Sequence, residues 1–242
     1  MGEVSNVFLV SGNAGQGKTT IAKNLAFALR HFGFDVLLVD ADLKTPKLGY
    51  HVGTPLITKT IQDVLLGRRS LSDAIYQRPS GLKVLLSGLT YVDTPHPVKL
   101  LPELRKQAHI IIIDVPTNDQ QWYDTKCDTI LVTQPDFPSV MDVQKLSKKA
   151  NVHSILVNRM HDDGIDLSLN NIKQLLSKPI LGIVPEEPCM REALRHGYSI
   201  IEFHPELQAS NALKECAAKL MNLEYQSPVR AVPFLAKLGL IQ

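Results

Sequence analysis

Short apolar runs alternate with amphipathic stretches along most of the chain. Seven runs rich in β-branched and aliphatic residues predict strands, and several are apolar at consecutive positions, as in HIIIID. Such runs suit parallel strands that helices cover on both faces. The predicted strands are Asn6–Val10, Asp35–Val39, Leu82–Leu86, His109–Ile113, Thr129–Thr133, His153–Val157 and Ile180–Val184.

Helical periodicity fills the segments between these strands. The predicted helices are Thr19–Phe32, Ile61–Leu66, Leu71–Tyr76, Val98–Gln107, Ser139–Ala150, Leu169–Leu176, Met190–His196 and Asn211–Met221. Strands that alternate with helices predict an α/β fold with a doubly wound, mainly parallel sheet and helices on both faces. The sequence has no internal repeat and no linker, so we expect one domain over residues 1–225 and a tail over residues 226–242.

Composition narrows the classes of function. The 242 residues carry a formal net charge of only +2, which gives no electrostatic case for nucleic-acid binding. The three cysteines are far apart without a CxxC pair, and the eight histidines lack metal-ligand spacing, so the spacing predicts neither a zinc site nor a disulfide framework. With no signal peptide and no membrane-length apolar run, we expect a cytoplasmic protein.

One loop carries specific chemistry. The segment GNAGQGKTT follows the first predicted strand, opens the first helix and matches the phosphate-loop pattern GxxxxGK[ST]. Glycines let backbone N–H groups turn toward a phosphate, and the helix N-terminus adds a positive end. Lys18 would bridge the β- and γ-phosphates, and the Thr19 hydroxyl would ligate Mg²⁺. The residues expected at the nucleotide are Gly12, Asn13, Ala14, Gly15, Gln16, Gly17, Lys18, Thr19 and Thr20.

Three carboxylates follow predicted strands. Asp40 and Asp42 come at the end of the second strand, and Asp114 ends the strand IIIID. In an open α/β sheet, ligands gather beyond the carboxyl ends of the strands. We therefore expect all three side chains to face the region of the phosphate loop.

The order of these segments resembles the MinD/ParA family of P-loop ATPases. SGNAGQGKTT, VLLVDADLKTPKLGYHVG, IIIDVP and ILVTQPDFPSVMDV carry the resemblance, which covers roughly residues 4–221. It is strongest toward the archaeal MinD-like branch, through GIVPEEPCMREALRHGYSI. The resemblance implies ATP or ADP and Mg²⁺ as ligands, and a nucleotide-dependent homodimer that acts on an unidentified protein partner.

The resemblance also implies roles for single residues. Thr19, Asp40 and Asp114 would surround the metal, while Lys18 and Asp42 would be catalytic, Asp42 by orienting the attacking water. The adenine pocket would be formed by Asn158, Arg159, Pro185 and Glu186.

Two positions depart from the family pattern. Asn13 stands where relatives carry a signature lysine that crosses the interface of an ATP-sandwiched dimer, and Asn118 stands where the DxPxG segment carries glycine. A neutral amide brings no positive charge to a transferring phosphoryl group, so we expect weak hydrolysis. Either Lys44 or Lys47 supplies the missing charge, or both are ordinary solvated lysines.

The sequence thus favours an ATP-binding switch with slow Mg-dependent hydrolysis that controls spatial positioning, or association with a partner or a membrane. One alternative is a non-catalytic nucleotide-binding module. Another is a tyrosine-autokinase-like protein, although Tyr225 is the one tyrosine beyond residue 200.

The tail has two interpretations. In Pro233–Gln242 the apolar residues recur at helical spacing. This segment is similar to the C-terminal membrane-targeting helix of MinD proteins, which would place the protein at the inner face of the cell membrane. A short strap packed on its own domain gives the same pattern.

Overall fold

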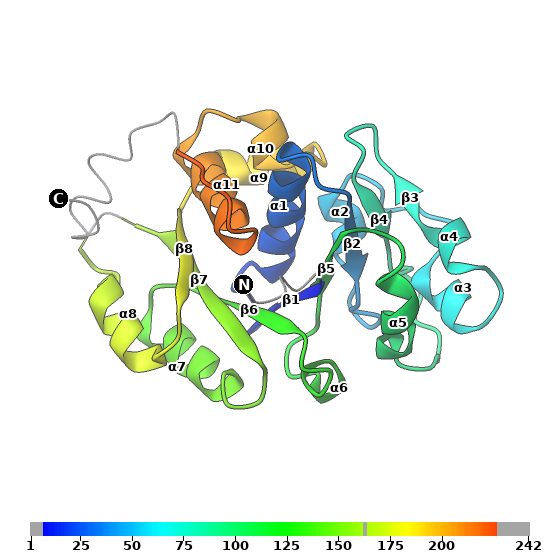
Figure 1. The fold of residues 1–242 in the computed structure, drawn as a ribbon, viewed down its shortest axis with the longest axis horizontal. Helices are drawn as coiled ribbons and strands as arrows, with labels where there is room; N and C mark the ends of the chain where they lie inside the picture. The colour runs from blue at the N-terminus through cyan, green and yellow to red at the C-terminus, as the bar shows by residue number, and fades with distance from the viewer. Residues whose placement is uncertain (1–6, 162–163, 227–242) are drawn as a thin grey trace.

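The computed structural model describes residues 7–161 and 164–226, and a single twisted sheet runs through them (Figure 1). Its strand order is β3-β4-β2-β5-β1-β6-β7-β8. The strands are β1 (Val7–Gly12), β2 (Val36–Asp40), β3 (Tyr76–Gln77), β4 (Lys83–Leu85), β5 (Ile110–Asp114), β6 (Asp128–Thr133), β7 (Val152–Met160) and β8 (Ile180–Pro185). Neighbouring strands are parallel except for β3 and β4, which confirms the predicted fold class.

Helices cover both faces of the sheet (Figure 1). One face packs against α1 (Lys18–His31), α2 (Leu48–His51), α9 (Cys189–Arg195), α10 (Ile200–Phe203) and α11 (Gln208–Leu220). The other face packs against α3 (Ile61–Leu65), α4 (Leu71–Ala74), η1 (Pro97–Leu100), α5 (Leu101–Leu104), α6 (Gln120–Tyr123), α7 (Phe137–Leu146) and α8 (Leu169–Leu176). Among the described residues, no helix combines the length and the apolarity that a membrane span requires.

The consecutive apolar residues of the central strands pack against the helices on both faces of the sheet. Within β1, Phe8 and Val10 join the core under α1 and α11, whereas Val7 and Leu9 join the core on the opposite face. Both sets are buried because side chains alternate across a strand. This arrangement explains why the central strands carry no polar face.

Several boundaries differ from the pattern-based prediction. The predicted helix Leu71–Tyr76 ends at Ala74, and Tyr76 pairs with β4 as an antiparallel edge strand. The predicted helix Val98–Gln107 is a 3-10 turn followed by a four-residue helix, each with a proline at its start. Helices α2, α6 and α10 were not predicted, because four residues are too few to show a periodicity.

Candidate functional site

The phosphate loop joins the end of β1 to the start of α1. Gly12 (φ 148°) and Gly17 (φ 91°) adopt backbone conformations that side chains rarely tolerate. A Cβ on Gly12 would lie 2.4 Å from the carbonyl oxygen of Val132. Gly17 caps α1 without any side-chain hydrogen bond, so the first N–H groups of the helix stay available to an anion.

Side chains from the far half of the chain hold this loop in shape. Gln16 is buried, its Nε2 donates to Ser139 Oγ (2.8 Å), and its Oε1 accepts from the Gln134 N–H (2.7 Å). Gln134 Nε2 also donates to the Gly15 carbonyl (3.0 Å), and Asn158 Nδ2 donates to the Gln16 carbonyl (2.9 Å). The Gln16 side chain therefore fixes the loop, which leaves its backbone to meet a ligand.

Lys18 and Thr19 connect the loop to the end of β5. Lys18 Nζ donates to the Asn13 carbonyl (3.1 Å) and to Thr117 Oγ1 (2.9 Å), and Thr117 donates onward to the Gly12 carbonyl (3.0 Å). Thr19 Oγ1 donates to Asp114 Oδ2 at 2.6 Å. The loop and the β5 carboxylate thus form one hydrogen-bonded unit around the Lys18 ammonium.

The two carboxylates at the carboxyl end of β2, Asp40 and Asp42, take different positions. Asp40 pairs in register with Asp114, and its carboxylate accepts the N–H groups of Asp42 and Leu48, both at 3.1 Å. Asp42 is half-exposed, and its carboxylate accepts from Lys44 N (3.1 Å), Thr45 N (2.8 Å) and Thr45 Oγ1 (2.8 Å). Both carboxylates therefore shape the segment that runs from the end of β2 to α2.

Burial strongly affects the charges at this centre. Burial raises the pKa of Asp114 to about 6, against the Thr19 hydrogen bond and the Lys18 charge, which lower it. Burial and then the Asp114 charge raise the pKa of Asp40 well above its usual range, while burial lowers the pKa of Lys18. The site thus holds two carboxyl groups whose ionised forms lack compensating charge.

The oxygen atoms at this centre suit a hard divalent cation. Asp114 Oδ1 is buried and has no hydrogen-bond partner within the described residues, although Oδ2 is satisfied by Thr19. Carboxylate and hydroxyl oxygens are the ligands that Mg²⁺ prefers. A cation beside Asp114 would satisfy Oδ1 and offset the charge that burial disfavours, so the residues present fit magnesium.

Asn13 is engaged within its own chain. Its Nδ2 donates to Asp142 Oδ2 on α7 at 2.6 Å, and its Oδ1 accepts the Ala14 N–H at 3.0 Å. Asn118, the other departure from the family pattern, adopts φ 59° and lines the same hollow as Asn13, Asp142 and Lys145. Asn13 is thus a tether between the phosphate loop and α7.

The residues predicted for an adenine pocket lie together. Asn158, Arg159, Pro185 and Glu186 line one pocket with Gly17 and Thr20, closed on its far side by Met190, Arg191 and Leu194 of α9. Arg159 adopts φ 58°, and its Nε lies 3.6 Å from Glu186 Oε2. The ends of β7 and β8 and the start of α1 therefore form a common cavity.

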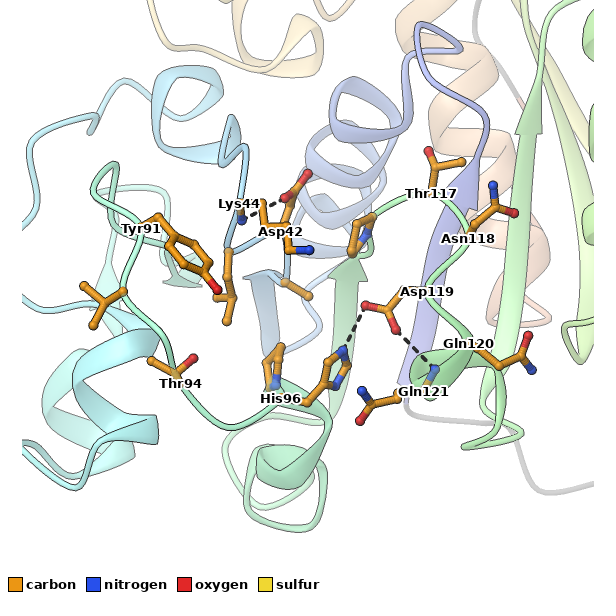
Figure 2. Close-up of a pocket in the computed structure, with 15 residues that line it drawn as sticks. Asp42, Lys44, Tyr91, Thr94, His96, Thr117, Asn118, Asp119, Gln120 and Gln121 are labelled. Atoms are coloured by element: carbon orange, nitrogen blue, oxygen red, sulfur yellow. Dashed lines mark hydrogen bonds and ion pairs between the residues drawn. The ribbon is translucent and has the colours of Figure 1, made fainter.

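A larger hollow of about 610 Å³ opens on the other side of the phosphate loop (Figure 2). Its walls are the segments after β2 (41–44), before η1 (91–97) and after β5 (116–121). His96 Nε2 lies 2.9 Å from Asp119 Oδ2 and joins two of these segments. Asp42 and Thr117, which belong to the centre described above, also line this hollow, so the two regions are contiguous.

Sequence reasoning missed the supporting residues Thr117, Gln134, Ser139 and Asp142. Thr117 had a detectable signal, since it stands three residues after Asp114 in the DVPT segment. The other three lie more than a hundred residues from their partners in the loop, so no local pattern marks them. Of the two lysines weighed earlier, Lys47 affects the pKa values of Lys18 and Asp114, whereas Lys44 lines the larger hollow.

Comparisons with known proteins identify the family and the fold that the chain resembles. The CobQ/CobB/MinD/ParA nucleotide binding domain matches residues 7–200. An uncharacterized ATP-binding protein of Methanocaldococcus jannaschii is 32% identical over 239 residues, covering 93% of this chain and 90% of the relative. The septum site-determining protein MinD of Pyrococcus horikoshii, solved with Mg-ADP, superposes with a TM-score of 0.76 at 29% identity over 88% of this chain and 94% of that one. MinD in the MinC:MinD cell division complex of Aquifex aeolicus gives 0.79 at 27% identity over 91% and 97%.

Proposed function

The chain belongs to the CobQ/CobB/MinD/ParA nucleotide-binding family, and we propose that it is an ATP-operated switch protein. In this proposal it binds ATP with Mg²⁺, hydrolyses it slowly, and changes the surface that it offers to a partner. The observation that carries the proposal is the unit of Lys18, Thr19 and Asp114, assembled on a preshaped loop with one carboxylate oxygen still unsatisfied.

The phosphates of the nucleotide would bind at the start of α1. The uncapped N–H groups there and the Lys18 ammonium supply donors and positive charge to a polyphosphate. Thr19 and Asp114 would hold magnesium, with Asp40 next to them across the sheet. Magnesium supplies further neutralisation of phosphate charge when it is bound. The pocket at Asn158 and Pro185 would receive the base.

Asp42 would orient the water that attacks the terminal phosphate. Its carboxylate accepts three hydrogen bonds from Lys44 and Thr45, and Oδ2, which accepts one of them, keeps capacity to accept a water. These bonds hold Asp42 in place, so the position of the water depends on this loop. Asn13 contributes no charge and is bonded to Asp142, so the chain lacks a mobile cation at this position. The missing charge supports slow turnover.

Lys47 is the better candidate to supply the missing charge. Its ammonium is close enough to alter the pKa values of Lys18 and Asp114, and its side chain is exposed. We expect Lys47→Ala to reduce ATP turnover while Lys44→Ala, the matched control on the same segment, leaves it unchanged. If neither variant changes turnover or nucleotide-dependent dimerisation, these lysines have no such role.

The hollow between the 41–44, 91–97 and 116–121 segments is the proposed partner surface. Two of its walls are the segments that follow Asp40 and Asp114, so a change at the phosphate site alters its shape directly. The Aquifex aeolicus relative is found in a MinC:MinD cell division complex, which supports a protein partner and a role in spatial positioning. A nucleotide-dependent homodimer belongs to the same proposal.

Membrane association would extend this switch. The tail Pro233–Gln242 that motivates it lies outside the described residues. Sedimentation with liposomes, with and without ATP, tests the idea. Equal pelleting of the full chain and of a chain ending at Tyr225 would exclude membrane targeting through the tail.

Calorimetry and turnover assays test the main proposal. We expect Mg-ATP and Mg-ADP to bind the wild type, Lys18→Ala to lose binding, and Asp42→Asn to bind ATP but lose hydrolysis. Asp93→Asn serves as a control on an exposed aspartate. Binding without turnover in the wild type would favour the non-catalytic module, and no heat with either nucleotide would refute nucleotide binding.

The kinase alternative is disfavoured by the position of its acceptor. Tyr225 packs on Phe32 (ring centroids 5.2 Å apart), just beyond the C-terminal end of α1. The phosphate loop lies at the other end of this 14-residue helix, about 20 Å away. Incubation with radiolabelled ATP checks this point, because phosphotyrosine on the protein would revive the kinase alternative.

A further inference from the structure

A second group of side chains, of residue types that can bind a metal, comes from α9 and from the end of α10. These two helices are neighbours in the fold (Figure 1), and other residues of α9 line the pocket that contains Gly17 and Thr20. Cys189 and Glu192 are three positions apart on α9, so they project from the same side of the helix. His204 is the residue at which α10 ends. One ligand atom from each of these three residues lies within 4.8 Å of the other two.

A carboxylate lies beside the His204 ring. The ring Nδ1 lies 3.1 Å from Glu206 Oε1. A histidine that binds a metal through one nitrogen usually donates its other N–H to a carboxylate or carbonyl, which fixes the tautomer. Because Nδ1 is committed to Glu206, Nε2 is the nitrogen left to bind a cation.

Carboxylate side chains lie around this group. Glu187 Oε1 accepts the Cys189 N–H at 3.1 Å, and the Cys189 thiol also hydrogen-bonds to the Glu187 side chain. Glu192 and Glu206 add two more carboxylates. Lys214 opposes them, and its Nζ donates to the Pro205 carbonyl (2.9 Å). Glu187, Glu192 and Glu206 thus place three carboxylates around the group, and Arg191 and Arg195 of α9 carry positive charge on the same helix.

We propose that Cys189, Glu192 and His204 form a binding site for a thiophilic divalent cation, and that Zn²⁺ is the best match. Thiolate, imidazole and carboxylate are the ligands that zinc takes, whereas Mg²⁺ and Ca²⁺ take oxygen alone. Three protein ligands leave the fourth position to water. On binding, the metal–sulfur bond forms as the thiol S–H bond breaks, and the proton passes to Glu187 or to the buffer.

The geometry requires only small side-chain movement. Ligand atoms of a tetrahedral zinc site lie about 3.5 Å apart at normal bond lengths. The ligand atoms must therefore draw together by at most about 1.3 Å, which the exposed Glu192 and half-buried Cys189 can do by rotamer adjustment. Sequence spacing gave no hint of this site, because His204 reaches it only through the turn between α9 and α10.

Titration of the full chain with Co²⁺, in the absence of nucleotide, tests the proposal. We expect a sulfur-to-cobalt charge-transfer band that saturates at one Co²⁺ per chain and is displaced by Zn²⁺. Cys189→Ser should remove the band, and His204→Asn should weaken Co²⁺ binding by at least tenfold. Glu206→Gln should weaken it roughly 10-fold to 100-fold through the ring orientation. His196→Asn, on an exposed histidine at the end of α9, is the matched control and should bind as the wild type does.

Three results would overturn the site. One is the absence of a charge-transfer band in the wild type. Another is a band that persists in Cys189→Ser, which would assign the thiolate to Cys127 or Cys216. The third is unchanged affinity in His204→Asn. Because the assay contains no nucleotide and reads a thiolate, its outcome is independent of the phosphate site.

Discussion

Replacing Asp114 with asparagine should stabilise the nucleotide-free protein, and the gain should depend on pH. Burial raises the pKa of this carboxyl group from its ordinary 3.8 to about 6. One pKa step corresponds to about 1.4 kcal/mol, so ionised Asp114 lowers the free energy of unfolding by about 3 kcal/mol. Asparagine keeps the oxygen that accepts the Thr19 hydroxyl and removes the charge.

The sign of the pH dependence follows from the raised pKa. As the pH rises from about 3.8 to about 6, the unfolded chain releases the Asp114 proton before the folded chain does. The contribution of protonated Asp114 to the free energy of unfolding of the wild type is therefore fully present below about pH 3.8, and it is lost as the pH rises to about 6 and above. The advantage of Asp114→Asn should grow from near zero at about pH 4 to about 3 kcal/mol above about pH 7. The substitution also removes the Asp114 charge that helps to raise the pKa of Asp40. The pKa of Asp40 should therefore be lower in the variant than in the wild type, which further stabilises the variant at high pH.

Urea unfolding at a series of pH values measures this effect. The single tryptophan, Trp122, is buried and reports unfolding by fluorescence. Asp93→Asn, on an exposed carboxylate, controls for the removal of a charge and should show no such growth with pH. A variant no more stable than the wild type at pH 8, or an advantage that does not change with pH, would refute the reasoning.

Further predictions concern single residues. Gly12→Ala should lower the free energy of unfolding by about 2 kcal/mol or more, because its Cβ would meet the Val132 carbonyl, whereas Gly15→Ala, with no atom within 4 Å, should cost less. Equal urea midpoints for the two variants would contradict this contrast. Trp122→Ala should cost about 3–5 kcal/mol, measured by circular dichroism during urea unfolding, since the ring is fully buried; a loss below about 1 kcal/mol would contradict that packing. Asn13→Lys should raise ATP turnover roughly tenfold or more, measured by phosphate release, because it restores a charge of arginine-finger type. Unchanged turnover, with Lys18→Ala inactive, would show that charge at this position does not limit hydrolysis.

Local patterns were sufficient to predict seven of the eight strands in the described residues, all except β3, and to mark the glycine-rich loop after β1. The central strands can be recognised in the sequence because alternate side chains of β1 and β5 pack into cores on opposite faces of the sheet. These strands therefore have no polar face. Lys18 and Thr19 are recognisable because their chemistry requires a fixed spacing from Gly12 and Gly17. Asp40 and Asp114 follow from strand ends alone, and the structure pairs them in register.

Contacts between distant segments could not be predicted in the same way. The bonds of Gln16 to Gln134 and of Asn13 to Asp142 join residues 118 and 129 positions apart. The sequence around Gln16 and Asn13 does not indicate which distant residues they contact. These contacts form because α7 and the segment before it pack beside the loop. The link between His96 and Asp119 depends likewise on the course of two loops. The sequence therefore marked side chains that the structure brings together at the candidate site, but not the residues that hold them.

The place of β1 in the sheet has a consequence for synthesis. Its two neighbours are β5 and β6, which begin at Ile110 and Asp128, about a hundred residues after β1 ends at Gly12. A chain emerging from the ribosome therefore keeps at least one edge of this apolar strand unpaired until more than half of the protein has been made. Fragments that stop before Asp128 would expose an aggregation-prone edge and could not shape the turn at Gly12. The pairing of β1 is thus completed only after that of β2, β4 and β5, although all three follow it in the chain.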